Sequence, residues 1–208
     1  LDVKDFVKIK DPLVTLARDL AVQLEEIEAR QRIEEGALNS LLAKYVDAKM
    51  EFQNKGFLPD ANSTLRLTFG NIKGYSPGDG AYYEPITTLT GLIEKGESTG
   101  DYELPQDIVK AYVAKDFGQF NYAKKDNVPV CILYDTDTSG GNSGSPVLDA
   151  DGNLVGVNFD RAYKATINDY AWDPGYSRSI GVDIRYVLWV ASKIDKADNV
   201  LKELKVYK

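Results

Sequence analysis

The sequence predicts a mostly β fold with helices: a helical arm, a β-barrel-like domain and a closing C-terminal helix. Three observations predict this order. Apolar residues in the first fifty-odd positions recur at steps of three or four, as in an amphipathic helix. After Gly56 the chain changes to short β-type runs separated by turn residues. Residues 184–204 return to a helical pattern. We therefore expect two domains, 1–56 and 57–208.

The N-terminal helix has a clear start signal. Asp11 is a suitable N-cap, and Pro12 fits the first helical position, where its missing N–H is not needed. Gly36 either interrupts or only weakens the helix, and Gly56 is the expected stop. The apolar stripes before and after Gly36 are Leu13, Leu16, Leu20, Leu24 and Ile27, then Leu38, Leu41, Leu42, Tyr45, Val46 and Met50.

The β region is predicted from runs of branched and aromatic residues. The expected strands cover residues 63–73, 86–93, 128–134, 147–148, 154–159 and 177–182. The turn Ala150–Asn153 predicts a hairpin between the fourth and fifth of them. Residues 105–117 are expected to form a short helix. Asp183 should cap the closing helix, which has a break near 195–199.

Composition excludes some classes of function. The net charge of −7 and the scattered basic residues argue against a nucleic-acid partner, which needs a basic stripe. No apolar run approaches the roughly 20 residues that span a bilayer. The charged start Leu1–Asp5 lacks the apolar region of a signal peptide, and its direct entry into helix-like sequence suggests a piece of a longer protein.

Several residues have a structural interpretation. Cys131 is the one cysteine, so no intrachain disulfide is expected, and its apolar surroundings predict a buried structural thiol. The absence of an intrachain disulfide does not show in which cellular compartment the protein lies. Asp135 and Asp137 lack a histidine or a spaced carboxylate cluster beside them, so we expect no metal and no cofactor. Trp172 and Trp189 are expected to pack rather than to line a site.

Residues 138–147, TSGGNSGSPV, carry the chemical signal. They resemble the Gly-Asp-Ser-Gly-Gly-Pro pattern around the nucleophile of trypsin-like peptidases, with Asn for Asp and Ser for the last Gly. An oxyanion hole needs two backbone N–H groups aimed at one point, and glycine permits the required dihedral angles. By this match Ser143 is the nucleophile, and Gly141 and Ser143 supply the N–H groups. The alternatives are a Gly/Ser-rich connecting loop and Ser145 as the nucleophile.

A serine hydroxyl needs a general base, and this chain contains no histidine. A lysine base is chemically feasible, but no lysine stands in a context that suggests desolvation. We therefore expect the base and its orienting carboxylate to lie outside these 208 residues.

Five separated motifs resemble the serine dipeptidyl aminopeptidases of Gram-negative bacteria, the dipeptidyl-peptidase 7/11 family. The motifs cover residues 59–66, 72–75, 87–89, 140–146 and 181–188. The resemblance implies the C-terminal part of such an enzyme, with a trypsin-like barrel over 57–208. Residues 1–56 would then be the end of an inserted α-helical domain, and the catalytic His and Asp would lie on an N-terminal barrel.

The segment Asn158–Arg161 suggests the substrate. In this family the Asp that matches Asp160 holds the free α-ammonium of the substrate. The next position is Gly in the branch selective for hydrophobic residues and Arg in the Asp/Glu-specific dipeptidyl-peptidase 11 branch; here it is Arg161. An extended dipeptide spans about 6–7 Å, so one fixed carboxylate can measure it, and a guanidinium can bind an acidic side chain by two hydrogen bonds. The alternative is a surface pair without function.

These expectations give two hypotheses. The first is the nucleophile-bearing part of a serine exopeptidase that removes N-terminal dipeptides after Asp or Glu and is inactive alone. The resemblance implies a periplasmic or secreted homodimer that acts on peptides with a free N-terminus. The second is a non-catalytic peptide-binding module or pseudopeptidase. The presence of His and Asp in a longer N-terminal region distinguishes the two.

Overall fold

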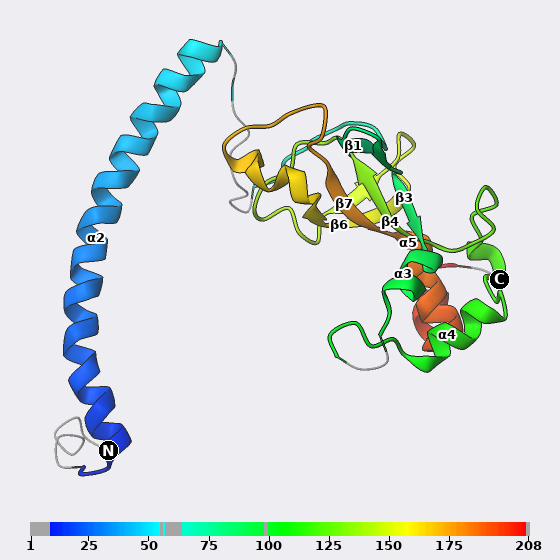
Figure 1. The fold of residues 1–208 in the computed structure, drawn as a ribbon, viewed down its shortest axis with the longest axis horizontal. Helices are drawn as coiled ribbons and strands as arrows, with labels where there is room; N and C mark the ends of the chain where they lie inside the picture. Colours follow the sequence, from blue (N-terminus) through cyan, green and yellow to red (C-terminus); the bar gives the residue numbers. More distant parts are fainter. Residues whose placement is uncertain (1–8, 55, 57–63, 98–99, 207–208) are drawn as a thin grey trace. The chain divides into compact units, whose positions relative to one another are not determined.

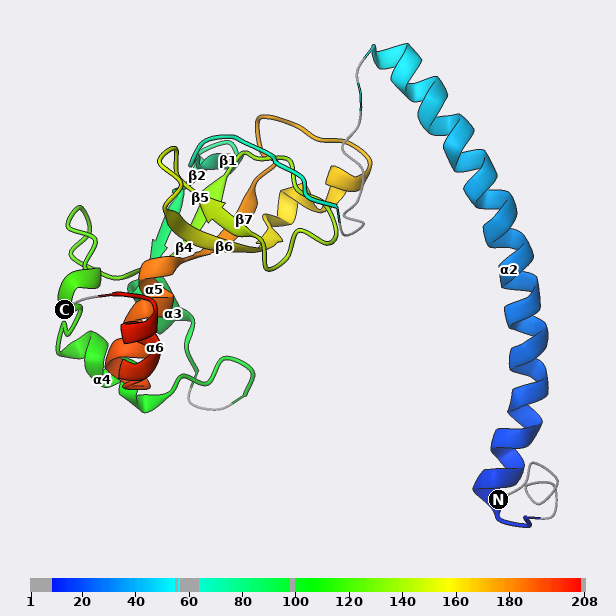
Figure 2. The ribbon, with the colours of Figure 1, turned by 180° about the vertical axis from the view of Figure 1, so that it is seen from behind.

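The computed structural model describes residues 9–54, 56, 64–97 and 100–206. Contacts divide the chain into two compact units, Leu1–Phe57 and Leu58–Lys208. The described part of the first unit is one long helix, whereas the second holds the sheets and the other helices (Figures 1 and 2). None of the described helices is long and apolar enough to cross a membrane.

The long helix α2 (Pro12–Gln53) begins where the sequence predicts. Asp11 Oδ1 accepts hydrogen bonds from the backbone N–H groups of Leu13 at 2.8 Å and Val14 at 3.3 Å. The helix continues through Gly36, because one glycine costs only about 1 kcal/mol and does not break a helix of 42 residues. It ends before Gly56, at Asn54, which adopts the left-handed conformation that Asn tolerates.

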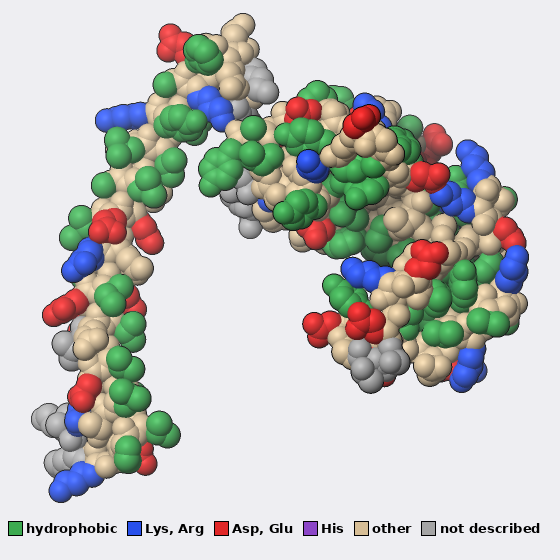
Figure 3. Space-filling model, in the orientation of Figure 1, with side chains coloured by type: hydrophobic (Ala, Val, Ile, Leu, Met, Phe, Trp, Pro, Cys, Tyr) green, Lys and Arg blue, Asp and Glu red, His purple; other side chains and the backbone are tan. Residues whose placement is uncertain are grey.

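The apolar stripes of α2 remain exposed from Leu13 to Met50. Figure 3 shows hydrophobic side chains along the whole length of the helix, between charged ones. The stripes therefore predict the helix correctly, but within the described part of its unit they do not form a core.

The main sheet of the second unit has five strands in the order β3-β4-β7-β6-β5, and every neighbouring pair is antiparallel. The strands are β3 (Ile86–Thr88), β4 (Pro129–Tyr134), β5 (Pro146–Leu148), β6 (Leu154–Arg161) and β7 (Ser179–Asp183). A separate hairpin joins β1 (Tyr75–Gly78) and β2 (Ala81–Tyr83). β3 and β5 are the two edges of the five-stranded sheet as described.

The fold is mixed helix and sheet, and the expectation of a mostly β chain is wrong. Helices hold more residues than strands, because α2 alone has 42 residues and the strands have only three to eight. The described strands form an open sheet, so the closed trypsin-like barrel stays a prediction.

The predicted strands at residues 128–134 and 177–182 are confirmed, as is the hairpin of β5 and β6. Its turn is stabilised by Asp149, whose side chain accepts hydrogen bonds from the N–H groups of Asp151 and Asn153 at 3.0 and 2.9 Å. The strand predicted at 63–73 is wrong for residues 64–73, which show only an isolated bridge from Ile72 to Tyr134.

The strand predicted over residues 86–93 ends at Thr88, and α3 (Leu89–Lys95) follows. The predicted helix within 105–117 is α4 (Gln106–Val113). The C-terminal pattern gives α5 (Ile184–Trp189), the π-helical turn η3 (Val190–Ile194) and α6 (Asp198–Glu203). Asp183 caps α5 as predicted, because its side chain accepts from Arg185 N–H at 2.9 Å.

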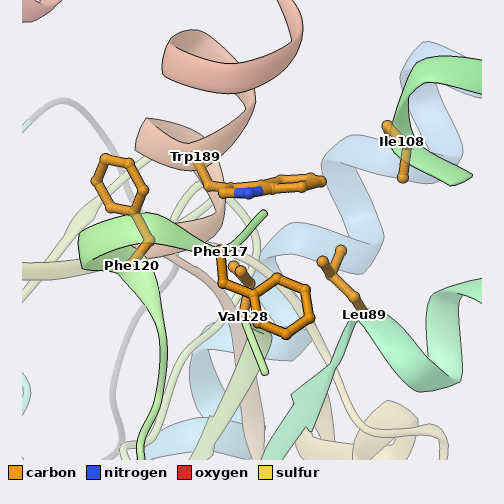
Figure 4. Close-up of a cluster of buried hydrophobic side chains, with 6 residues drawn as sticks. All are labelled: Leu89, Ile108, Phe117, Phe120, Val128 and Trp189. Carbon is orange, nitrogen blue, oxygen red and sulfur yellow. The ribbon is translucent and has the colours of Figure 1, made fainter. Parts of the chain in front are cut away.

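The largest described core lies where α3, α4 and α5 meet one end of the sheet (Figure 1). Figure 4 shows the buried indole of Trp189 beside Phe117, Val128 and Leu89. The Trp189 Nε1–H donates to the carbonyl of Asp116 at 2.9 Å, which satisfies its polar atom. The expectation that Trp189 packs in the core is therefore confirmed.

Arg178 is a buried cation, only 1% exposed. Its guanidinium donates to the carbonyls of Lys73 and Gly74 at 3.0 to 3.1 Å and to carbonyls within the turn 174–177 at 2.6 to 3.4 Å. Its backbone carbonyl also accepts from Ala162 N–H at 2.8 Å. One side chain thus joins the approach to β1 with the turn that precedes β7.

We expect Arg178→Met to lower the free energy of unfolding by about 3 kcal/mol or more, because several buried carbonyls lose their donor together. Denaturant titration of the chain measures this. Lys193→Met is the matched control: its partner Asp116 lies 2.6 Å away on the surface, so the loss should stay below about 1 kcal/mol. Equal losses in the two variants would contradict a structural role for Arg178.

Candidate active site

The loop between β4 and β5 carries the predicted nucleophile. Gly141 and Gly144 have φ values of 90° and 86°, which L side chains rarely adopt, so the loop requires glycine at both positions. Ser143 lies in a turn between them and is exposed rather than buried inside a strand. The sequence pattern therefore produces a sharp, exposed turn.

Ser143 Oγ donates a hydrogen bond to the backbone carbonyl of Phe159 on β6, at 3.1 Å. Within the described residues, the backbone N–H groups of Gly141 and Ser143 have no protein acceptor. Free N–H groups beside a hydroxyl are what an oxyanion hole requires. The hydroxyl itself faces a carbonyl and not a basic nitrogen.

A pocket of about 110 Å³ brings the predicted residues together. Ser143 lines it with Asp160 and Arg161, which lie on β6. The other lining residues are Thr138, Ser139, Gly140, Asn158 and Phe159. Gly141 and Ser145 are not among the lining residues, so the pocket favours Ser143 over Ser145 as the reactive hydroxyl.

A bulge in β6 positions the two charged residues. Asn158 pairs with Gly181 and Asp160 pairs with Ile180, so Phe159 is the additional residue on β6. Bulges redirect side chains and are common beside active sites. Asp160 Oδ1 accepts a hydrogen bond from Arg161 N–H at 2.8 Å, which orients the carboxylate. Asp160 is exposed and Arg161 is partly buried.

Hydroxyl groups form another part of the pocket wall. Thr138 Oγ1 lies 2.6 Å from the Oγ atom of buried Ser179, and Ser179 Oγ donates to the carbonyl of Thr136 at 3.0 Å. The single proton of Ser179 is used on that carbonyl, so Thr138 is the donor in the first bond. This chain of hydrogen bonds connects the end of the serine loop to β7.

The sequence interpretation missed the roles of Thr138, Asn158 and Tyr134. Thr138 and Asn158 stand inside the motifs already quoted, so a pattern was available for them. Tyr134 had no sequence signal beyond its position in an apolar run. Burial raises the pKa of its phenol, which therefore stays protonated and can only donate or accept as a neutral group.

Cys131 and the acidic residues before the serine loop have other partners. Cys131 is half-buried, and burial raises the pKa of its thiol, which disfavours the reactive thiolate. Asp135 accepts a hydrogen bond from Asn71 N–H at 2.6 Å and lies 3.9 Å from the Lys73 ammonium. The described residues contain no group of three His, Cys, Asp or Glu side chains that could hold a metal ion.

Comparison with known proteins gives consistent matches. The family model for peptidase S46 matches residues 1–206. An Asp/Glu-specific dipeptidyl-peptidase of Flavobacterium psychrophilum is 40% identical over 206 residues, 98% of this chain and 28% of that protein. A dipeptidyl-peptidase 7 of Porphyromonas endodontalis is 36% identical over 220 residues, covering 99% of this chain and 26% of that protein.

Solved structures agree with these sequence matches. The crystal structure of Porphyromonas endodontalis DPP11 in complex with the dipeptide Arg-Glu superimposes with a TM-score of 0.82 and 32% identity. The superposition covers 97% of this chain and 30% of that one. This chain therefore spans less than a third of the length of each of these three relatives.

Proposed function

Because the chain belongs to the peptidase S46 family, we propose that it is the nucleophile-bearing part of a serine exopeptidase that removes N-terminal dipeptides, cutting after Asp or Glu. One observation carries the proposal. Ser143, Asp160 and Arg161, three residues that the sequence assigns separately, line the same pocket of about 110 Å³. A nucleophile, an anchor for an ammonium and an anchor for a carboxylate are the parts that this reaction needs.

Ser143 attacks the carbonyl carbon of the second substrate residue, and the N–H groups of Gly141 and Ser143 stabilise the resulting oxyanion. The attack requires removal of the hydroxyl proton, and the 208 residues contain no histidine for that step. We propose that the base and its orienting Asp come from an N-terminal barrel of a longer polypeptide. The hydrogen bond from Ser143 Oγ to the Phe159 carbonyl would then be exchanged for one to the base.

Asp160 determines where the substrate is cut. Its carboxylate is held by the Arg161 N–H at the end of β6 and lines the same pocket as Ser143. An α-ammonium bound there places the peptide bond after the second residue of an extended peptide about 6–7 Å further along the chain. The enzyme would therefore release dipeptides and would require a free amino terminus.

Arg161 selects the side chain at the cleaved bond. Its guanidinium can bind a carboxylate through two charge-assisted hydrogen bonds, a geometry that lysine does not offer. Membership of the family does not decide this point, because matched relatives include both Asp/Glu-specific enzymes and dipeptidyl-peptidase 7. The DPP11 structures solved with the dipeptides Arg-Glu and Arg-Asp, each with an acidic second residue, support the choice.

A non-catalytic peptide-binding module is the second candidate. The absence of histidine from the chain favours it, and so does the Ser143 hydroxyl that donates to a carbonyl. Such a module would bind peptides through Asp160 and Arg161 and would not cut them.

The resemblance to the dipeptidyl aminopeptidases supports three further proposals. The five-stranded sheet is part of a trypsin-like barrel, α2 belongs to an inserted helical domain, and the whole protein is a homodimer in the periplasm or outside the cell. The antiparallel strand order and the position of the serine loop between β4 and β5 agree with the first of these.

In the whole protein, we expect Ser143→Ala to lower kcat by roughly 10⁵- to 10⁶-fold, since a serine nucleophile acts as a unit with its base. The measurement is release of a chromogenic group from a dipeptidyl substrate. Ser145→Ala is the control and should keep most of the activity. The 208-residue chain alone should show no turnover, and turnover that Ser143→Ala abolishes in this chain would instead indicate a lysine base.

Asp160→Ala in the whole protein should strongly reduce kcat/KM for peptides with a free amino terminus, because the ammonium loses its only assigned partner in the pocket. The loss should be roughly ten- to a hundredfold for one charge-assisted interaction. N-acetylated peptides should already be poor substrates of the unmodified enzyme. Equal cleavage of acetylated and free peptides would exclude this role for Asp160.

Arg161→Gly should lower kcat/KM for Asp and Glu at the cleaved bond by roughly ten- to a hundredfold and should relax the penalty on Leu. Arg161→Lys should keep part of the preference for acidic residues but lose the bidentate hydrogen bond to the carboxylate. Matched Asp, Glu and Leu substrates measure the three values. An unchanged preference in Arg161→Gly would remove the specificity proposal and leave the peptidase proposal standing.

A further inference from the structure

Asn158 contacts the serine loop on both sides of the nucleophile. It is 6% exposed and lies on β6. Its backbone N–H donates to the carbonyl of Ser145 at 2.9 Å, and its backbone carbonyl accepts from Gly144 N–H at 2.7 Å. Its side-chain Nδ2 donates to the carbonyl of Asn142 at 3.2 Å. Asn142, Gly144 and Ser145, which flank Ser143, are thus all hydrogen-bonded to Asn158.

The bond to Asn142 determines the direction of a catalytic N–H. The Asn142 carbonyl and the Ser143 N–H belong to one planar trans peptide, so they point in opposite directions. The Asn142 carbonyl accepts from two inward donors, Asn158 Nδ2 and the Ser145 N–H at 3.0 Å. The Ser143 N–H must therefore point away from the interior. Among the described residues it has no protein acceptor, as an oxyanion donor requires.

Tyr134 holds the Asn158 amide from the side opposite the serine loop. Tyr134 is 4% exposed, and its hydroxyl donates to Asn158 Oδ1 at 2.6 Å. If the amide were reversed, its oxygen would face the Asn142 carbonyl, and two acceptors would oppose each other. Gly181 leaves room for the phenol, because a Cβ there would lie 3.1 Å from the Tyr134 hydroxyl. The Asn142 carbonyl, which can only accept, therefore specifies which side of the amide faces the loop, and the phenol holds the amide in that orientation with a second hydrogen bond.

We infer that Tyr134 and Asn158 are positioning residues for the oxyanion hole, acting through the peptide between Asn142 and Ser143. The inference rests on the proposed role of Ser143 as nucleophile. Asn158 also lines the pocket, but in this scheme neither side chain contacts the reacting atoms. They hold the Ser143 N–H at the place where negative charge develops, which is where preorganised donors lower the barrier.

The test uses the whole protein, with Tyr134→Phe and Asn158→Asp as variants. Loss of one oxyanion donor lowers kcat by roughly 100- to 1,000-fold. Asn158→Asp replaces the inward donor by an acceptor, so we expect kcat to fall about 100-fold. Tyr134→Phe frees the amide to rotate, and we expect about a tenfold fall. For Tyr134→Phe, KM should stay within about twofold, since the lining of the pocket is unchanged.

Tyr75→Phe and Asn127→Asp are matched controls. Tyr75 is buried like Tyr134, and Asn127 is a buried amide that bonds Thr90 Oγ1 at 2.8 Å and Val128 N–H at 2.9 Å. Asn127→Asp should lose thermal stability as Asn158→Asp does, and neither control should lower kcat. Tyr134→Phe removes only one oxygen atom, so it keeps the test valid if Asn158→Asp does not fold.

A second readout separates positioning from general damage. A peptide boronic acid forms a tetrahedral serine adduct with an oxygen at the oxyanion position, whereas a dipeptide product does not. The variants should weaken inhibition by the boronic acid in proportion to their loss of kcat and leave product inhibition unchanged. Unchanged kcat in the two variants, or a kcat loss that the controls share, would overturn this inference and leave the proposed function standing. A wild-type protein without Ser143-dependent turnover would overturn the proposed function and this inference together.

Discussion

The pairing of β6 with its neighbours is the constraint on which the site depends. β6 lies between β5 and β7, and its backbone continues the ladder beyond β5 into the serine loop through the bonds of Asn158. The end of the same strand carries Asp160 and Arg161. Because buried backbone groups must find partners, the strand cannot shift without breaking bonds on both sides. The separation between Ser143 and both charged groups is thus set by backbone hydrogen bonds.

A buried cation supports this arrangement from the other end. Among the described residues the Arg178 guanidinium is solvated by backbone carbonyls, and its own carbonyl accepts a hydrogen bond from Ala162, the residue after Arg161. A guanidinium suits this role because its donors lie in a fixed plane. Gly74, whose carbonyl accepts from Arg178, must be a small residue because a Cβ there would collide with the Tyr83 carbonyl and the Tyr82 phenol. Polar contacts of a buried cation therefore hold the backbone directly after the pocket residue Arg161.

The sequence predicted the parts of the structure that local chemistry decides. The Asp11 cap, the turn at Gly152 and the glycines of the serine loop each follow from a backbone requirement of a few residues. Residues 64–73 were predicted wrongly because their alternating apolar pattern does not say whether a partner strand is present; Leu65 is fully exposed. The roles of Tyr134 and Asn158 were missed for a related reason, although Asn158 stands inside a quoted motif. Their importance arises only when β4, β6 and the serine loop come together.

The bulge at Phe159 bears on how such a site can evolve. It resets the alternation of side chains just before Asp160, so the deletion or insertion of one residue in this strand would turn each charged side chain to the face opposite its present one. A replacement at position 161 leaves the backbone as it is and changes only the chemistry of the wall. If Arg161 selects the substrate as proposed, selectivity can change by a single replacement there, whereas a change in strand length would disturb the whole wall.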